Sequence, residues 1–430
     1  MKTRKWVILI SATLILQGCL KRETEKKTVL AIPVYGQSLA LGEEAIRITD
    51  FQQFSAQCHH RVLTENLDEQ FGFLSDTHFK QWMKKLLQDR HRAFELSIYG
   101  MSEAVIKYLD QKGYGDRVML CTFPGWQGAS SIVDIGEGTK PYQKFLEEIT
   151  AAQQKAHDKG WDFVVPAFCW MQGEDDALWK KSVDYKKDLK TFQRNLNKDI
   201  KAITHQKRDV ICICYQTNCL TLTKAYKPNS FTEKESQVPQ AQLELVRDDE
   251  HFMASGPTYP YTFAENSAHI DGLSQKRLGY LAGLSVIRLL DSMPSKGLTP
   301  AAFELLGDTL NIRFNIPKPP LVFDTVAVTK ASNYGFSVID ASNTNIIRQV
   351  HMEKDRVIIY CYKSPLGCKV RYAVNGSPRK NGFREGPRGN LRDSQGNFLK
   401  ATIQKKVYPL HNWCYQFDVL LQETHRTNSK

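Results

Sequence analysis

From Thr28 as far as Pro294, short apolar runs alternate with longer segments in which apolar residues recur at helical spacing. Four of the runs are mostly apolar on both faces and predict strands: Val29–Tyr35, Arg117–Phe123, Asp162–Trp170 and Asp209–Gln216. Strands of this kind, separated by helices, are typical of a parallel sheet that helices cover on both sides. We therefore expect an α/β fold with a doubly wound parallel sheet.

Three segments predict the helices that connect these strands. One begins at Pro141 and ends before Gly160, the usual places of these two residue types at helix ends. A second carries apolar residues at steps of four, three, four and four, and a third follows Ser274 as its expected N-cap. The apolar positions of the second helix are Tyr185, Leu189, Phe192, Leu196 and Ile200.

The pattern changes near Pro294, where short strands follow one another with Gly, Pro and Asn turns between them. The predicted strands are Leu310–Ile316, Thr325–Thr329, Arg356–Tyr362 and Cys368–Val374. Frequent strands without helices favour an all-β sandwich. We therefore expect an α/β domain over residues 28–293 and a smaller C-terminal β-sandwich domain over residues 294–430.

The N-terminus predicts export from the cytoplasm. Three basic residues precede an apolar run, Trp6–Leu16, that is too short to span a bilayer. The run leads into Leu16-Gln17-Gly18-Cys19, which resembles a bacterial lipobox. We expect residues 1–18 to be a lipoprotein signal peptide, Cys19 to carry lipid and residues 19–27 to form a short tether. The alternative is an ordinary signal peptide that happens to contain a cysteine.

Such an anchor would hold the protein in the bacterial cell envelope, facing either the periplasm or the outside. The formal net charge is +12, but Lys and Arg are interleaved with Asp and Glu along the chain. Because there is no basic stripe, we expect no nucleic-acid partner, and we expect membrane contact only through the lipid. Ten cysteines are too few for a disulfide scaffold of this length. Cys361 and Cys368 flank a Ser-Pro-Leu-Gly turn and are the best-placed pair for a disulfide.

Ligands of open α/β sheets bind beyond the carboxyl ends of the strands. Three of the predicted strands run into unusual segments there: Gly36–Gly42 (GQSLALG), Gly125–Ser131 (GWQGASS) and Trp170–Asp176 (WMQGEDD). Small residues in the first segment allow Ser38 to project its hydroxyl group from a sharp bend. A fourth segment, His269–Leu273, precedes the last predicted helix of the α/β region.

These four segments, in this order, resemble the blocks of the SGNH hydrolases, and within them the sialate O-acetylesterase-like and acetylxylan-esterase-like carbohydrate esterases. The first resembles the Gly-Gln-Ser block, the second the Gly-rich oxyanion block and the third the Gln-Gly-Glu block. The interval from His269 to Gly279 is similar to the histidine block. Two C-terminal segments, Val370–Ala373 and Gly386–Asp393, resemble parts of sialate O-acetylesterase-like proteins.

The resemblance implies an SGNH-type, flavodoxin-like three-layer domain and a serine esterase that removes acetyl groups from O-acetylated carbohydrate, either sialic acid or plant polysaccharide. Ser38 would be the nucleophile and His269 its base. The backbone N–H groups of Ser38 and Gly128, with the side-chain amide of Gln172, would hold the oxyanion. Gln37 and Trp126 would contact the substrate, with the indole ring stacked on a sugar. No metal or organic cofactor is required.

One position departs from the family pattern. The family usually has an aspartate three residues before the histidine, where this chain has Asn266. A neutral amide cannot stabilise an imidazolium as a carboxylate does. Three acids are candidates for the role: Glu265, Asp271 and Glu174. We prefer Glu174, because some related carbohydrate esterases are understood to use the glutamate of the Gln-Gly-Glu block; the alternative is that Glu174 only braces its loop.

Two other functions stay open from the sequence. An SGNH lipase or acyl esterase would need an apolar groove near Ser38, which Leu39, Ala40 and Leu41 permit. A non-catalytic glycan-binding lipoprotein on the same scaffold is supported only by Asn266.

Overall fold

The computed structural model describes residues 26–59, 61–63, 94–179, 182–222, 226–227, 233–264 and 267–423. The expected signal peptide, Cys19, Glu265 and Asn266 lie outside these residues. Within the described part of the chain, no helix is both long enough and apolar enough to cross a membrane.

The first three predicted strands are present, and each has a break. For the second strand, the part after the break begins at Pro124, beyond the predicted end at Phe123. The halves are β1 (Thr28–Ala31) and β2 (Val34–Gly36), β4 (Val118–Cys121) and β5 (Pro124–Trp126), and β6 (Asp162–Val164) and β7 (Ala167–Met171). The interruptions contain Pro33 and Pro166 or immediately precede Pro124. A proline has no N–H group to donate to the neighbouring strand, so each one ends the regular pairing locally.

The strand halves form one parallel sheet together with β3 (Val62–Leu63), β8 (Ile211–Gln216) and β9 (Phe252–Pro257). Regular pairing gives the orders β3-β4-β1-β6 and β5-β2-β7-β8-β9. Hydrogen bonds from Ile32 N–H to Cys121 O (2.8 Å) and from Val34 N–H to Phe123 O (2.9 Å) join the two parts. The five main strands therefore lie in the order second, first, third, fourth, fifth, and the predicted parallel sheet is confirmed.

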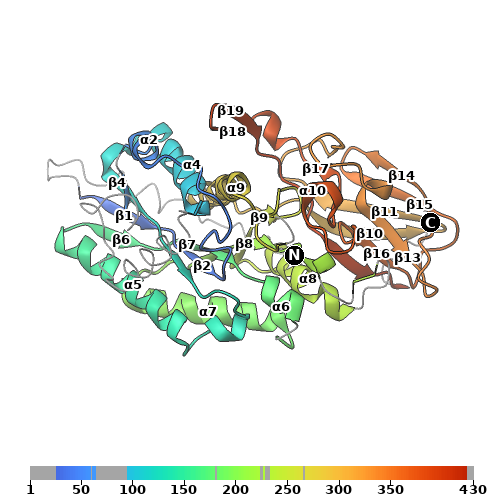
Figure 1. The fold of residues 1–430 in the computed structure, drawn as a ribbon, viewed down its shortest axis with the longest axis horizontal. Coiled ribbons are helices and arrows are strands. Elements are labelled where there is room, and N and C mark those ends of the chain that lie inside the picture. The colour runs from blue at the N-terminus through green and yellow to red at the C-terminus, as the bar shows by residue number, and fades with distance from the viewer. Residues whose placement is uncertain are drawn as a thin grey trace, which may run out of the picture.

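Helices cover both faces of this sheet (Figure 1). On one side lie α5 (Lys140–Asp158), α6 (Glu174–Trp179), α7 (Tyr185–Thr204) and α8 (Glu233–Asp248), and on the other α2 (Phe51–Gln57), α4 (Ser97–Gln111) and α9 (Gly272–Leu290). The predicted N-cap of α9 at Ser274 is wrong. The cap is Asp271, whose carboxylate accepts the Ser274 N–H at 2.8 Å, so the helix begins at Gly272.

The C-terminal region contains antiparallel strands. A four-stranded sheet has the order β10 (Thr299–Leu306), β11 (Thr309–Asn315), β15 (Arg356–Cys361) and β14 (Ile347–Glu353). A three-stranded sheet has the order β13 (Phe336–Ile339), β16 (Lys369–Tyr372) and β20 (Phe417–Leu420). Two small pairs complete the region: β12 (Val322–Phe323) with β17 (Leu391–Arg392), and β18 (Lys400–Ile403) with β19 (Lys406–Pro409).

Two predictions for this region are wrong. Residues 325–329 form a turn, because the Asp324 carboxylate accepts the N–H groups of Val326 and Ala327 at 3.0 and 2.8 Å. Cys361 and Cys368 are free thiols. They do not face each other across a hairpin, since β15 pairs with β11 and β14 whereas β16 pairs with β13 and β20.

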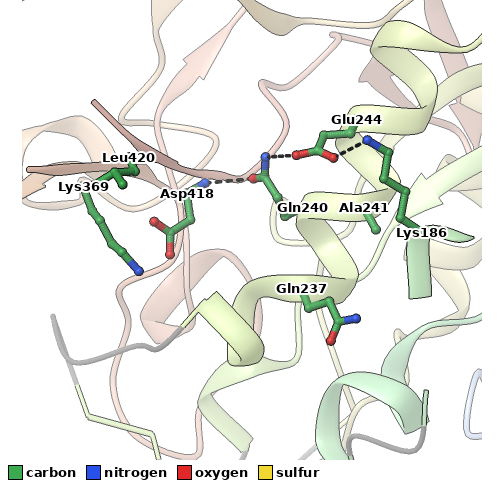
Figure 2. Close-up of a pocket in the computed structure, with 8 residues that line it drawn as sticks. All are labelled: Lys186, Gln237, Gln240, Ala241, Glu244, Lys369, Asp418 and Leu420. Atoms are coloured by element: carbon green, nitrogen blue, oxygen red, sulfur yellow. Dashed lines mark hydrogen bonds and ion pairs between the residues drawn. The ribbon is translucent and has the colours of Figure 1, made fainter. Parts of the chain in front are cut away.

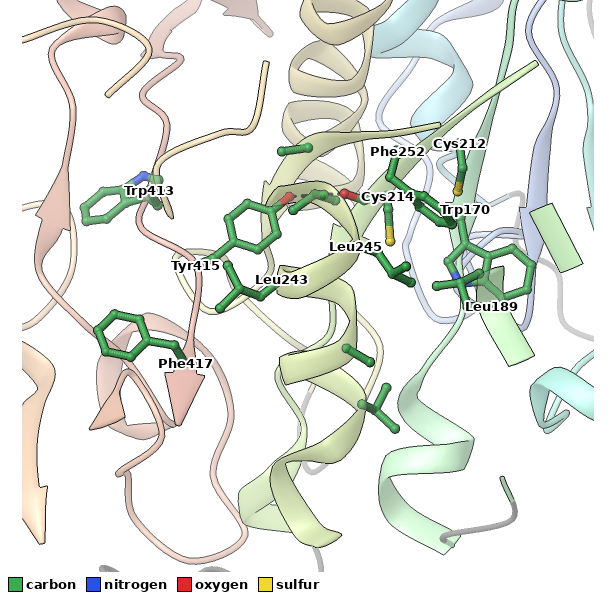
Figure 3. Packing of buried hydrophobic residues seen from close by; sticks show 14 of the residues in the cluster. Trp170, Leu189, Cys212, Cys214, Leu243, Leu245, Phe252, Trp413, Tyr415 and Phe417 are labelled. Carbon is green, nitrogen blue, oxygen red and sulfur yellow. Dashed lines mark hydrogen bonds between the residues drawn. The ribbon is translucent and has the colours of Figure 1, made fainter. Parts of the chain in front are cut away.

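A continuous layer of buried side chains runs from the parallel sheet through α8 into the C-terminal strands (Figure 3). It includes Trp170 in β7, Leu243 in α8 and Phe417 in β20. The chain passes from α9 into β10 over residues 291–298. A domain boundary at residue 293 stays a prediction.

Buried hydrogen bonds also join the two regions. The Tyr415 hydroxyl donates to Cys214 O at 3.1 Å and accepts the Gly256 N–H at 2.9 Å. The Gln216 side chain donates to Gln416 O at 2.8 Å and accepts the Gln416 N–H at 2.7 Å. Because unpaired polar groups are costly to bury, these contacts fix the C-terminal region against β8 and β9.

Candidate active site

The carboxyl ends of the parallel strands bring the predicted site residues to one edge of the sheet. Ser38 follows β2, Gly128 follows β5 and Gln172 follows β7. His269 lies between β9 and α9. Four segments that are far apart in the sequence thus converge where the fold class places its ligands.

A tight turn presents Ser38. Hydrogen bonds from Ala40 N–H to Gln37 O (2.8 Å) and from Glu43 N–H to Ser38 O (3.0 Å) close it. The turn needs Gly36, because a Cβ atom there would lie 2.1 Å from the backbone oxygen of Met171. The Ser38 side chain is buried in this bend.

His269 contacts Ser38 directly. The distance from Ser38 Oγ to His269 Nε2 is 2.7 Å. The other ring nitrogen, Nδ1, lies 2.9 Å from Glu44 Oε2 and 2.9 Å from Ser267 Oγ. A hydrogen on Nδ1 satisfies the Glu44 carboxylate and leaves Nε2 as the acceptor for the Ser38 hydroxyl. Ser38, His269 and Glu44 therefore form a connected hydrogen-bond chain with the geometry of a nucleophile, a base and an orienting acid.

Glu44 was not among the acids predicted from the sequence. Those were the acids near His269 and the glutamate of the Gln-Gly-Glu block. Glu44 instead comes from the turn that carries the nucleophile, six residues after Ser38, and its backbone has the uncommon φ of +64°. An acid so close to the nucleophile, on the same turn, was the available signal.

Glu174 does not lie where our preferred assignment requires it, next to the His269 ring. Its side chain is buried, and both carboxylate oxygens lie 2.6 Å from the Tyr215 hydroxyl group. Burial raises the pKa of Glu174, while hydrogen bonds from Tyr215 and Thr217 and the charge of His269 act in the opposite direction. Among the described residues, Glu44 rather than Glu174 is within hydrogen-bonding distance of the His269 ring. Glu174 interacts with His269 only electrostatically, through the charge of its carboxylate and without a hydrogen bond.

Asp271 is occupied by its role as the cap of α9. Its carboxylate accepts the N–H group at the start of that helix. The remaining candidates, Glu265 and the Asn266 position, lie outside the described residues.

Gln172 is fully buried and fully engaged. Its amide nitrogen donates to Ser130 O at 3.1 Å and to Asp176 Oδ2 at 2.6 Å, and its amide oxygen accepts from the Tyr185 hydroxyl at 2.8 Å. Both amide hydrogens are used inside the protein. This geometry ties the Gly-rich loop to the end of β7 and differs from the donor toward the oxyanion that we expected.

Gln37 differs from Gln172, because only its amide oxygen is hydrogen-bonded among the described residues. Its amide oxygen accepts the N–H groups of Gly173 and Asp175, each at 3.4 Å. Among the described residues, no group accepts a hydrogen bond from Gln37 Nε2. Gln37 directly precedes Ser38 in the chain. Gly128 lies in open space, since a Cβ atom there would meet only the Trp126 ring, at 3.8 Å. The half-buried Trp126 therefore lies beside the expected backbone donor.

Residues 109–281 match the model of a carbohydrate esterase family that is described as sialic acid-specific acetylesterase. This part of the chain is therefore similar to that carbohydrate esterase family. The matched residues include Gly128, Gln172 and His269, whereas Ser38 and Glu44 precede them. The search of curated proteins finds no match to this sequence.

Solved structures of low sequence identity resemble this chain in fold. A crystal structure of a carbohydrate acetylesterase from Xanthomonas citri has a TM-score of 0.55 and 14% identity, and the match covers 91% of this chain and 80% of that chain. A protein from Arabidopsis thaliana (TM-score 0.40, 14% identity) covers 61% of this chain and 98% of its own. NanS (TM-score 0.39, 14% identity) covers 62% and 98%. The first match shows a shared fold that extends beyond the α/β region.

A cavity of about 290 Å³ lies between α8 and β20 (Figure 2). Its polar side chains contact one another: Lys186 pairs with Glu244 at 2.6 Å, and Gln240 donates to Glu244 at 2.9 Å and accepts the Asp418 N–H at 3.0 Å. These contacts join α7, α8 and β20. We assign the cavity to the junction between the α/β region and the C-terminal region. Within the described residues, His, Cys, Asp and Glu side chains form no cluster of three or more suited to a metal ion.

Proposed function

We propose that this protein is a serine esterase that removes acetyl groups from O-acetylated carbohydrate through an acyl-enzyme intermediate. The observation that carries the proposal is the contact of 2.7 Å between Ser38 Oγ and His269 Nε2, continued at 2.9 Å to Glu44. The carbohydrate esterase family match over residues 109–281 supports the ester and the sugar.

In the first step, Ser38 Oγ attacks the acetyl carbonyl carbon while His269 Nε2 takes the hydroxyl proton. The imidazolium then gives this proton to the departing sugar oxygen, and acetyl-Ser38 forms. In the second step, His269 takes a proton from water, the hydroxide attacks the acetyl group, and acetate leaves as Ser38 recovers its proton. The Glu44 carboxylate stabilises the imidazolium in both steps and fixes the tautomer.

The backbone N–H groups of Ser38 and Gly128 are the proposed donors to the oxyanion, in keeping with the family resemblance. We add Gln37 Nε2 as a third donor. Two backbone N–H groups hold the amide oxygen of Gln37, and these contacts orient its amide group. Gln172 acts one step further away, by holding the Gly-rich loop that carries Gly128. Each donor aimed at an oxyanion contributes about 10²- to 10³-fold in turnover.

Trp126 is proposed to stack on the sugar ring of the substrate, since its half-buried indole lies beside Gly128. The solved structure from Xanthomonas citri, which has a TM-score of 0.55, is described as a carbohydrate acetylesterase, and this description agrees with such a substrate. The strand order and the two antiparallel sheets support an SGNH-type, flavodoxin-like domain followed by a β-sandwich. We further propose export and a lipid anchor at Cys19, on the lipobox resemblance alone.

The test is acetate release by the purified mature protein from acetylated xylan, O-acetylated sialic acid and 4-nitrophenyl acetate. Ser38→Ala is the matched variant, since it removes one oxygen atom from a buried turn. Release that Ser38→Ala abolishes supports the proposal. Faster hydrolysis of aryl esters with eight or more carbons would favour the lipase, and glycan binding without turnover of any ester would favour the non-catalytic binding protein.

A further inference from the structure

A short segment of the C-terminal region lies against the loop that carries His269. We call residues 376–387 the bracing segment; it includes the one-turn helix α10 (Gly382–Glu385). It lies beside two parts of the α/β region: the residues that follow β8, and the loop between β9 and α9.

The histidine loop spans residues 262–271, and its described residues, 262–264 and 267–271, pair in antiparallel fashion. Its ladder consists of a hydrogen bond from Asp271 N–H to Thr262 O (3.0 Å), a bridge between Phe263 and Ile270, and a hydrogen bond from Ala264 N–H to His269 O (2.8 Å). Ser267 is near the tip and meets His269 twice. Its hydroxyl oxygen accepts the His269 N–H at 3.0 Å and lies 2.9 Å from Nδ1. The position of Ser267 therefore affects the position of the catalytic ring.

Asn381 of the bracing segment holds this tip. Its Nδ2 donates to the backbone oxygen of Ser267 at 2.9 Å. On the other side, its Oδ1 lies 3.4 Å from the buried Thr221 hydroxyl, which also contacts the Lys380 backbone oxygen. The Arg379 N–H donates to Thr221 O at 2.8 Å. Asn381 thus links the short helix η3 (Leu220–Leu222), which follows β8, to the histidine loop through contacts that involve both ends of its amide.

A second contact fixes the base of the loop. Phe383 N–H donates to Tyr261 O at 3.3 Å, next to the first residue of the histidine loop. The preceding residue, Gly382, has a φ of +77°, and a Cβ atom there would lie 2.6 Å from the same Tyr261 oxygen. The bracing segment therefore approaches the loop too closely for a side chain at this position.

From these contacts we infer that the C-terminal region completes the active site, with Asn381 as a positioning residue for His269 that acts through Ser267. The inference rests on the proposed esterase function. Displacement of a catalytic group by about 1 Å costs on the order of 10²-fold in rate. The antiparallel pairing still holds the loop without the Asn381 donor, so we expect a smaller loss, about 10-fold in kcat, with KM nearly unchanged.

The experiment compares Asn381→Ala and Asn381→Asp with Tyr226→Phe in the full mature chain. Asn381→Asp keeps the side-chain shape and replaces the donor by an acceptor at neutral pH. Tyr226→Phe is the matched control, since the Tyr226 hydroxyl holds the other end of the bracing segment, where it accepts the Gly376 N–H and donates to Gly376 O at 2.8 Å each. The readouts are kcat and KM for 4-nitrophenyl acetate, the unfolding temperature, and hydrogen exchange of the peptide that spans residues 262–271.

The inference predicts that both Asn381 variants lose kcat at constant KM and that exchange in this peptide rises, whereas Tyr226→Phe changes neither. Wild-type kcat and exchange in both Asn381 variants would overturn it, and so would an equal loss in Tyr226→Phe, which would indicate general docking rather than positioning. If the wild-type protein hydrolyses no ester, the proposed function fails. The exchange comparison then still decides whether Asn381 holds the loop.

Discussion

Replacement of Glu44 by glutamine removes one charge from the hydrogen-bond chain and leaves its shape in place. The amide oxygen of the glutamine can still accept from His269 Nδ1, so only the attraction between carboxylate and imidazolium is lost. Two unit charges about 4 Å apart attract by about 1 kcal/mol in water and about 4 kcal/mol near a protein surface. The Glu44 side chain is 44% exposed, which favours the lower half of this range.

We therefore expect about 1 to 2.5 kcal/mol, or roughly a 5- to 70-fold lower kcat for Glu44→Gln. KM stays unchanged, because the imidazolium exists only as the reaction proceeds. Added salt should lower kcat of the wild-type protein and have little effect on the variant, since an exposed ion pair is screened. The assay is steady-state hydrolysis of 4-nitrophenyl acetate at low and high salt.

Two controls accompany this measurement. Glu43→Gln makes the same charge change at the neighbouring, half-buried position. We expect it to keep kcat within about 2-fold, because Glu43 contributes its backbone N–H to the turn of Ser38 and the substitution leaves that group in place. Glu174→Gln tests the assignment that the sequence favoured. Near-normal kcat in Glu44→Gln, together with collapse of kcat in a folded Glu174→Gln, would refute the reasoning and return the role to Glu174.

Three further substitutions test the surroundings of the site. Gln172→Ala should lower both kcat and the unfolding temperature, because it leaves buried polar partners unpaired at about 1–3 kcal/mol each; loss of kcat at an unchanged unfolding temperature would instead favour direct donation to the oxyanion. Burial raises the pKa of Glu174, so the native state holds its proton to higher pH than the unfolded chain. The free energy of unfolding should therefore fall as pH rises above the ordinary value of 4.5, and urea titrations should show a weaker fall in Glu174→Gln. Gly36→Ala should abolish ester hydrolysis, because its Cβ would lie 2.1 Å from Met171 O and the turn must move; wild-type kcat would contradict the account of the turn.

The sequence predicted the framework of the protein from local patterns. Runs that are apolar on both faces located the strands, and a proline followed by a glycine located α5. The breaks inside three of the strands followed from Pro33, Pro124 and Pro166, although the analysis did not use them. The wrong strand at 325–329 has a local cause as well, since the Asp324 side chain competes for the backbone N–H groups that a neighbouring strand would need.

The candidate site was harder to predict, because its contacts depend on how distant segments meet. Nothing near His269 in the sequence indicates that Glu44 lies 2.9 Å from its ring. The chemistry of Gln172 is likewise compatible with an oxyanion donor, and only the positions of Ser130 and Asp176 show that its hydrogens are used elsewhere. Asn381 belongs to a different region of the chain, and its link to Ser267 has no counterpart in residue spacing.

The two hydrogen bonds between the Gln216 side chain and the Gln416 backbone bear on how freely this chain can exchange parts with other proteins. A foreign module joined after α9 would need to place a backbone N–H and C=O at the same point, or the buried Gln216 side chain would lose these two hydrogen bonds. We therefore expect recombination at this junction to destabilise the protein, even where the new module folds well alone. The two regions are expected to change together over generations, as one inherited unit rather than as an enzyme with an interchangeable attachment.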